Sequence, residues 1–290
     1  MLKGAITAII TPFKNGRINY SKMEELIEYQ IENNIDGIVV CGTTGESSTL
    51  SEQEKKKLIK FTVDTVNKRI PVIAGTGCND TKKSLSMSKY AEDFGADYLL
   101  LVSPYYNKTT KQGIIKHYEY IADNTDIPSI IYNVPGRTGL NIDADTTIKL
   151  SEHPNILGIK EASGNIPQAM KIINEAADDF LVFSGNDDII VPMLSIGSVG
   201  VISVLSNILP KETHDMCMYY EKGEIEKAKA LQLHLSDLIS KLFIEVNPIP
   251  VKEAMNLLGY NIGDPRLPLV NMSKKNLDLL YLSLKDIFGI

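Results

Sequence analysis

Short and almost continuously apolar runs recur along the chain, and a segment with helical spacing of apolar residues follows each run. Runs rich in Val, Ile and Leu without polar alternation are typical of strands covered on both faces of a parallel sheet. The segment 20–33 shows the intervening pattern, because Met23, Leu26 and Ile27 fall on one helical face. The predicted strands span Ala5–Ile10, Gly37–Cys41, Pro71–Gly75, Tyr98–Val102, Ser129–Tyr132, Leu157–Lys160, Phe180–Ser184 and Gly200–Ser203.

Several predicted helices have recognisable first residues. Ser21 and Ser51 each precede a glutamate by three residues, which is the spacing of a capping box. Asp80 and Asp143 are further candidates for helix N-caps.

The strict alternation of strand and helix predicts an α/β protein with a parallel sheet, and eight such units predict a closed (β/α)8 TIM barrel over residues 1–224. An open, doubly wound sheet is the rival architecture, and it usually carries a nucleotide-binding loop. The sequence Gly75-Thr76-Gly77 lacks the third glycine of that loop, because Asp80 stands in its place, and no GxxxxGK[ST] motif occurs. We therefore favour the barrel.

From about residue 225 the pattern is purely helical, with predicted helices over 225–243, 251–258 and 274–288. Residues 225–290 are therefore predicted to form a C-terminal helical domain. We expect this extension to serve packing or assembly.

Composition narrows the class of protein. The chain has 290 residues, of which 43% are hydrophobic, so it can bury a large core. The net charge of −6, without a basic stripe, argues against a nucleic-acid partner. Three widely spaced cysteines fit reduced thiols better than a disulfide framework. The apolar run Ala5–Ile10 is too short for a signal peptide and no run is long enough to cross a membrane, so we predict a cytoplasmic protein.

The strongest candidate for chemistry is Lys160, at the end of the sixth predicted strand. In such barrels the chemistry takes place at the carboxyl ends of the strands. A lysine that is stripped of water loses its proton easily, and a neutral amine attacks carbonyl carbon. Lys160 could instead extend into solvent or pair with an acid such as Glu161.

Other polar residues are predicted at the same end of the barrel. The loop Gly42–Glu46 offers two hydroxyls and free backbone N–H groups, which can bind a carboxylate or a phosphate. Tyr132 ends the neighbouring strand and could relay protons with Thr43. Arg137 lies in a loop between Pro135 and Gly139 and suits bidentate capture of a carboxylate. An ordinary turn, a core tyrosine and a surface arginine are the alternatives.

Four motifs resemble the pyruvate-dependent class I aldolase superfamily, and most closely its dihydrodipicolinate synthase (4-hydroxy-tetrahydrodipicolinate synthase) family. They are GTTGE at 42–46, SPYYN at 103–107, YNVPGRTG at 132–139 and GIKEASG at 158–164. They occur in order at family-like spacing, and the resemblance covers essentially the whole chain. It implies condensation of pyruvate with L-aspartate-4-semialdehyde, the opening reaction of diaminopimelate and lysine biosynthesis.

The resemblance also implies a role for individual residues. Lys160 would form a Schiff base with pyruvate, and Tyr132, Thr43 and Tyr106 would relay protons, with Tyr106 reaching in from a neighbouring subunit. Thr43 and Thr44 would hold the pyruvate carboxylate, and Arg137 the semialdehyde carboxylate. Gly185 and Ile202 would contribute backbone contacts.

No organic cofactor or metal is implied, because the lysine itself withdraws the electrons; the sequence likewise shows no His/Cys/carboxylate cluster. The implied assembly is a homotetramer built as a dimer of dimers.

The resemblance further implies an effector cleft that binds free lysine in regulated relatives. Ser47, Asn79 and Tyr105 match that pattern, whereas Lys83 stands where regulated members carry a glutamate. We therefore expect a vestigial cleft and weak or absent inhibition by lysine.

Two other functions share parts of this pattern. N-acetylneuraminate lyases and keto-deoxy sugar-acid aldolases share the lysine, the tyrosine and the glycine-rich loop, but Arg137 and Tyr106 favour the synthase. A non-catalytic sensor of keto acids would have no need for Lys160, Tyr132 and Thr43 together.

Overall fold

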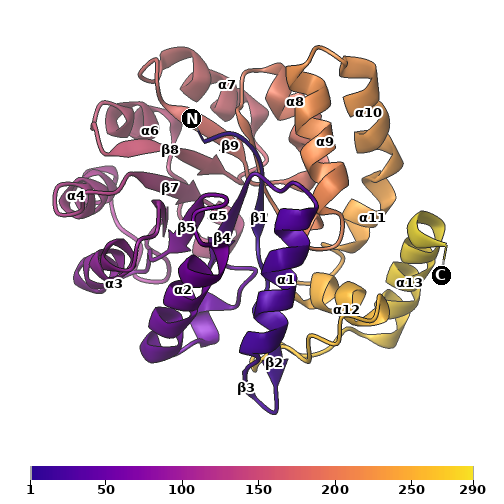
Figure 1. Cartoon of the computed structure of the whole chain (residues 1–290). Coiled ribbons are helices and arrows are strands. Elements are labelled where there is room, and N and C mark those ends of the chain that lie inside the picture. The colour runs from indigo at the N-terminus through magenta and orange to yellow at the C-terminus, as the bar shows by residue number, and fades with distance from the viewer. Residues whose placement is uncertain (1, 290) are drawn as a thin grey trace.

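The computed structural model describes residues 2–289 and shows a closed barrel of parallel strands surrounded by helices (Figure 1). Each barrel strand lies beside its neighbours in chain order, and the last strand pairs with the first. The barrel strands are β1 (Gly4–Ala8), β4 (Gly37–Val40), β5 (Val72–Gly75), β6 (Tyr98–Val102), β7 (Ser129–Asn133), β8 (Ile156–Glu161), β9 (Leu181–Ser184) and β10 (Gly200–Ser203). The predicted (β/α)8 barrel is therefore confirmed, with strand ends that differ by at most two residues from those predicted.

One main helix follows each barrel strand and covers the outside of the barrel. These helices are α1 (Tyr20–Glu32), α2 (Glu52–Val66), α3 (Thr81–Asp93), α4 (Lys111–Ala122), α6 (Ala144–Ser151), α7 (Ile166–Glu175), α8 (Ile190–Ser195) and α9 (Pro210–Glu221). A small hairpin, β2 (Phe13–Lys14) with β3 (Arg17–Ile18), lies between β1 and α1 and was not predicted.

The helix starts follow the capping residues at three of the four predicted positions. The Ser51 capping box is present in both directions, and the side chains of Asp80 and Asp143 accept hydrogen bonds from the first turns of α3 and α6. The prediction for Ser21 was wrong. Asn19 caps α1 instead, because its side chain accepts the Lys22 N–H at 3.2 Å and so places the first turn two residues earlier.

The C-terminal segment contains α10 (Ile225–His234), α11 (Ser236–Lys241), α12 (Ile249–Leu257) and α13 (Lys274–Phe288). The predicted helix over 225–243 is thus two helices on either side of Leu235. Figure 1 shows α12 and α13 beside the barrel, on the side of β2, β3 and α1. This contact is direct, since the Phe13 N–H donates to the Ile262 carbonyl at 2.8 Å.

Two hydrophobic clusters pack against the two faces of the barrel wall. The larger one lies between the strands and the helices, and the smaller one fills the barrel interior with residues such as Ile6, Val39, Phe183 and Ile202. Because successive strand residues point to opposite faces, Tyr132 belongs to the interior cluster and lies at its carboxyl end. The inward-facing residues at the strand ends therefore meet above this packed interior.

Candidate active site

Lys160 and Tyr132 lie side by side at the carboxyl ends of β8 and β7. The strand register pairs the two residues directly, and Lys160 Nζ lies 4.6 Å from the centroid of the Tyr132 ring. Lys160 is only 6% exposed, so the alternative that it extends into solvent is wrong.

Burial changes the acid–base chemistry of this lysine. Desolvation lowers the pKa of Lys160 to about 8; the negative charge of Asp187 opposes that shift and the positive charge of Arg137 adds to it. At this pKa roughly a tenth of the amine is neutral at pH 7, against well under a thousandth for an ordinary lysine. Lys160 is therefore suited to nucleophilic attack near neutral pH.

Three of the predicted catalytic and substrate-binding residues, Thr43, Tyr132 and Arg137, line one cavity of about 240 Å3, whereas Lys160 is not among its lining residues. Burial raises the pKa of Tyr132, while the charge of Arg137 and a hydrogen bond with Thr43 lower it. The phenol is consequently protonated at neutral pH and can donate a proton. Thr43 is the hydroxyl neighbour that a relay through Tyr132 requires.

The C-terminal segment reaches this cavity through Asn247, which the sequence analysis missed. Arg137 Nη2 donates to the Asn247 carbonyl at 2.9 Å, and Asn247 Nδ2 donates to Thr44 Oγ1 at 3.0 Å. Thr44 is 2% exposed and is not among the residues that line the cavity. Asn247 therefore orients two predicted substrate-binding residues from a position 203 residues away from Thr44.

Asp187 is a second residue without a predicted role. Its Oδ2 accepts the backbone N–H groups of Val204 and Leu205, both at 2.9 Å, while its buried Oδ1 has no hydrogen-bond partner within residues 2–289. Burial raises the pKa of Asp187, whereas these hydrogen bonds and the charge of Lys160 lower it. Asp187 is thus a fixed acid that acts electrostatically on Lys160.

Gly185 and Ile202 lie close to the site but do not line the cavity. The Gly185 N–H donates to the Glu161 carbonyl at 2.7 Å, and a Cβ at position 185 would come within 2.4 Å of the Ala162 Cβ. The Ile202 side chain is fully buried in the barrel interior. The predicted backbone contacts of both residues with substrate stay predictions.

Tyr106 lies outside the cavity. It is 92% exposed, and its φ of 68° places it in a turn closed by the Asn107 N–H, which donates to the Tyr105 carbonyl at 2.9 Å. Tyr105, by contrast, lines the cavity. Within a single chain Tyr106 therefore does not meet Lys160.

A second cavity, of about 330 Å3, adjoins the first and shares Lys55, Gly75 and Tyr105 with it. Asn79 and Lys83 line this second cavity, whereas Ser47 lines the cavity of Thr43 instead, and the role of this cleft as an effector site stays a prediction. Ser47 follows directly on the Gly42–Glu46 loop, and its N–H donates to the Gly42 carbonyl, which turns it towards that cavity. Lys56, Lys83 and Lys55 all lower the pKa of Glu52 at this cleft.

Within residues 2–289 no group of three or more His, Cys, Asp or Glu side chains is placed to hold a metal ion. In the same residues no helix is long and apolar enough to cross a membrane.

The chain is similar to known proteins along its whole length. Residues 1–287 match the model of the dihydrodipicolinate synthetase family. A 4-hydroxy-tetrahydrodipicolinate synthase of Clostridium tetani (strain Massachusetts / E88) is 55% identical over 281 residues, which are 97% of this chain and 96% of that protein.

Solved structures agree with this match. The chloride-inhibited dihydrodipicolinate synthase of Acinetobacter baumannii complexed with pyruvate has a TM-score of 0.97 and 42% identity, and the match covers 100% of both chains. A protein described as the first monomeric dihydrodipicolinate synthase variant has a TM-score of 0.96 and 45% identity, with 98% of this chain and 96% of that chain covered.

Proposed function

This chain belongs to the dihydrodipicolinate synthetase family, and we infer that it condenses pyruvate with L-aspartate-4-semialdehyde to give 4-hydroxy-tetrahydrodipicolinate. The product opens the route to diaminopimelate and lysine. The observation that carries this conclusion is the buried, easily deprotonated Lys160 beside Tyr132 in a chain of this family. Sugar-acid aldolases share the lysine, whereas the relatives reported above are dihydrodipicolinate synthases.

The reaction begins when the neutral Lys160 amine attacks the keto carbon of pyruvate. Water leaves and a protonated imine forms, which withdraws electrons and makes the methyl protons acidic. Loss of one methyl proton gives an enamine, whose carbon attacks the aldehyde of the semialdehyde. The amine of the bound product then displaces Lys160 as the ring closes, which frees the enzyme.

Tyr132, Thr43 and Tyr106 relay the protons of these steps. Tyr132 and Thr43 line a common cavity, and Thr43 lowers the pKa of Tyr132, which supports the first two members. The exposure of Tyr106 supports its delivery into the cavity of a neighbouring subunit. The assembly we propose is a homotetramer, a dimer of dimers.

The carboxylate contacts follow the chemistry of the side chains. Thr43 and Thr44 hold the pyruvate carboxylate, and the Arg137 guanidinium holds the carboxylate of the semialdehyde. Backbone groups of Gly185 and Ile202 complete the pyruvate site. Lys160 supplies the electron sink, so the reaction requires neither a metal nor an organic cofactor. Three unpaired cysteines and the biosynthetic reaction fit a cytoplasmic location.

A panel of aldehydes tests the reaction. Purified protein is assayed with pyruvate and, in turn, aspartate semialdehyde, N-acetylmannosamine and glyceraldehyde. Turnover with the semialdehyde at least about a hundredfold above the others is expected, because Arg137 binds a carboxylate that the other two lack. Preference for either sugar aldehyde would contradict the proposed function.

Mixing of variants tests the shared site. Chains with Tyr106→Phe and chains with Lys160→Ala are each expected to be nearly inactive, and hybrids of the two should regain activity. Hybrids that are verified by mass spectrometry and stay inactive would show that Tyr106 does not cross between subunits.

A further inference from the structure

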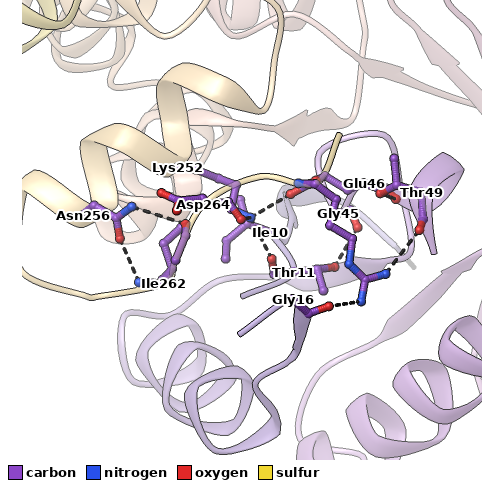
Figure 2. Close-up of polar contacts among 12 residues, drawn as sticks. Ile10, Thr11, Gly16, Gly45, Glu46, Thr49, Lys252, Asn256, Ile262 and Asp264 are labelled. Carbon is purple, nitrogen blue, oxygen red and sulfur yellow. Dashed lines mark hydrogen bonds and ion pairs between the residues drawn. The ribbon is translucent and has the colours of Figure 1, made fainter. Parts of the chain in front are cut away.

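The loop Gly42–Glu46 is held in place by a buried ion pair with the C-terminal segment. Glu46 Oε1 lies 2.7 Å from Lys252 Nζ on α12, and Glu46 Oε2 accepts the backbone N–H of Arg266 at 2.9 Å. The side chains of Lys252 and Glu46 are 1% and 0% exposed. Figure 2 shows Lys252 extending from its helix towards Glu46 across the gap between the two segments.

All three donors of the Lys252 ammonium are used. Besides Glu46 they reach the carbonyls of Thr11 at 3.2 Å and Asp264 at 3.3 Å (Figure 2). The ammonium also lies 4.4 Å from the centroid of the Phe13 ring. A buried ion pair that is satisfied in this way has a single favourable geometry. The pair therefore fixes the Glu46 side chain in one position.

The backbone of this loop needs such support. Non-glycine residues in the left-handed region stand at both its ends, Cys41 with φ 57° and Glu46 with φ 56°. Such a backbone conformation is strained for a residue with a Cβ atom and persists only when its surroundings hold it. At Gly45 the support comes from Thr11, whose hydroxyl donates to the Gly45 carbonyl at 2.7 Å, and at Glu46 it comes from the ion pair.

Glu46 is coupled through the loop backbone to Thr43 and Thr44, the proposed substrate-binding threonines. The Glu46 N–H donates to the Thr43 carbonyl at 3.0 Å, which closes the loop over Thr44. A shift of Glu46 would therefore move the Thr43 hydroxyl relative to Tyr132, with which Thr43 lines the cavity.

We propose that Glu46 and Lys252 are a positioning pair, whose buried contact holds the loop Gly42–Glu46 in the shape that binds the carboxylate of pyruvate. This inference rests on the proposed function, because it assigns the loop to pyruvate. It also gives the C-terminal extension a part in the active site, beyond the packing role expected from its sequence.

A purely stabilising role is the competing explanation, and the two roles can be separated. Replacing both members of a buried ion pair by uncharged residues of similar volume is often neutral for stability, whereas losing one member leaves an unpaired charge. The double variant Glu46→Gln/Lys252→Met should thus fold and yet lack the contact that aligns the loop. The matched control is Lys274→Met/Asp278→Asn, which removes an exposed ion pair of α13 with the same 2.7 Å separation.

The experiment measures the pyruvate concentration at which borohydride traps half of the chains as an adduct at Lys160. For Glu46→Gln/Lys252→Met we expect this concentration to rise roughly tenfold or more, with full labelling at saturation and an unchanged KM for the semialdehyde. The control variant should match the wild type. Melting temperatures of all three proteins show whether each is folded.

The half-saturation of the variants decides whether Glu46 and Lys252 position the loop. A folded double variant with the half-saturation of the wild type would overturn the positioning role. Should the double variant not fold cooperatively, Lys252→Arg keeps the buried charge but changes the donor geometry, and we expect it to raise the half-saturation severalfold. Wild-type half-saturation in that variant would equally overturn it. Absence of any adduct in the wild type would instead refute the proposed function, and this inference with it.

Discussion

Two lysines are buried in the part of the chain that the structure describes, and they lie in surroundings of opposite kinds. Lys160 ends a barrel strand, and Lys252 lies on α12 of the C-terminal segment. Each ammonium lies over an aromatic ring, at 4.6 Å from Tyr132 and 4.4 Å from Phe13. Burial lowers the pKa of both.

The difference lies in their partners. Lys252 gives its three donors to Glu46 and two carbonyls, so its charge is matched and its amine cannot reach another molecule. Lys160 has no ion pair in the part of the chain that the structure describes, and it contacts Tyr132, which lines the cavity together with Thr43. Desolvation is therefore common to both lysines, and the absence of an ion pair is what leaves the Lys160 amine free for the nucleophilic role proposed for it.

The largest expected effect concerns which lysine reacts. Lys160→Arg should keep a positive charge but lower kcat by about a thousandfold or more, since a guanidinium does not deprotonate to attack a carbonyl. Mass spectrometry after treatment with pyruvate and borohydride should find one reduced pyruvyl group per chain, on Lys160. Label on Lys252, or on any other lysine, would show that Lys160 is not the lysine that reacts with pyruvate.

The free energy of unfolding, in contrast to activity, should depend more on Lys252 than on Lys160. Lys252→Met leaves Glu46 buried without its partner and should lower the free energy of unfolding by about 3–5 kcal/mol. Lys160→Met should cause no loss at pH 7, because it removes a buried ammonium that has no ion pair. Urea unfolding of both variants measures the difference.

The stability difference between the wild type and Lys160→Met should also depend on pH. The pKa of Lys160 is about 8 in the folded chain and near its ordinary 10.5 when unfolded. Between these values the unfolded chain binds more protons, so the wild type gains stability as the pH rises. Any stability that Lys160→Met gains over the wild type by removing the buried ammonium should therefore shrink above pH 8. Equal losses of unfolding free energy in Lys252→Met and Lys160→Met at pH 7 would contradict the difference between the paired Lys252 and the unpaired Lys160.

The barrel and the position of Lys160 at the carboxyl end of its strand could be predicted from sequence because their signals are local. Each strand is a short apolar run, and a polar residue at its end must lie at the mouth once the fold is recognised; Lys160, Tyr132 and Arg137 were found in this way. The helix start at Asn19 was missed because Ser21 has the same kind of side chain and a glutamate at the right spacing.

The support of the site could not be predicted in the same way. Asn247 and Lys252 reach the Gly42–Glu46 loop across more than 200 residues, by packing that no local pattern records. One signal was available for Lys252, which is a lone cation in the apolar helix start Ile249-Pro250-Val251-Lys252. Identifying its partner Glu46 needed the three-dimensional structure.

Asp187 offers a smaller test of what tunes Lys160. Its negative charge raises the pKa of Lys160, so Asp187→Asn should lower that pKa below about 8, by about one pH unit or less. The rate of adduct formation, which rises as the amine deprotonates, should then reach its half-maximum at a lower pH. Asp188→Asn, at the exposed neighbouring residue, is the matched control. An unchanged profile in Asp187→Asn would mean that the Asp187 carboxyl is uncharged in the folded protein.

The smallest expected effect is the response to free lysine, where a third kind of lysine environment matters. Lys55 and Lys83 line the second cavity, and neither is fully buried. A free lysine molecule that enters this cleft brings its own ammonium close to that of Lys83. At a few ångströms this repulsion is worth on the order of several kcal/mol near a protein surface, whereas allosteric coupling is typically about 1–3 kcal/mol. We therefore expect less than about twofold inhibition by millimolar lysine.

Reversing the charge sharpens this last prediction. Lys83→Glu replaces the repulsion by attraction and should create inhibition by lysine, while Lys82→Glu, at the exposed residue next to it, should not. Initial rates at saturating pyruvate and semialdehyde, with increasing lysine, measure both variants. If submillimolar lysine already halves the rate of the wild type, Lys83 points away from the bound effector, and the cleft accepts lysine through Asn79 and Tyr105 despite the change of charge.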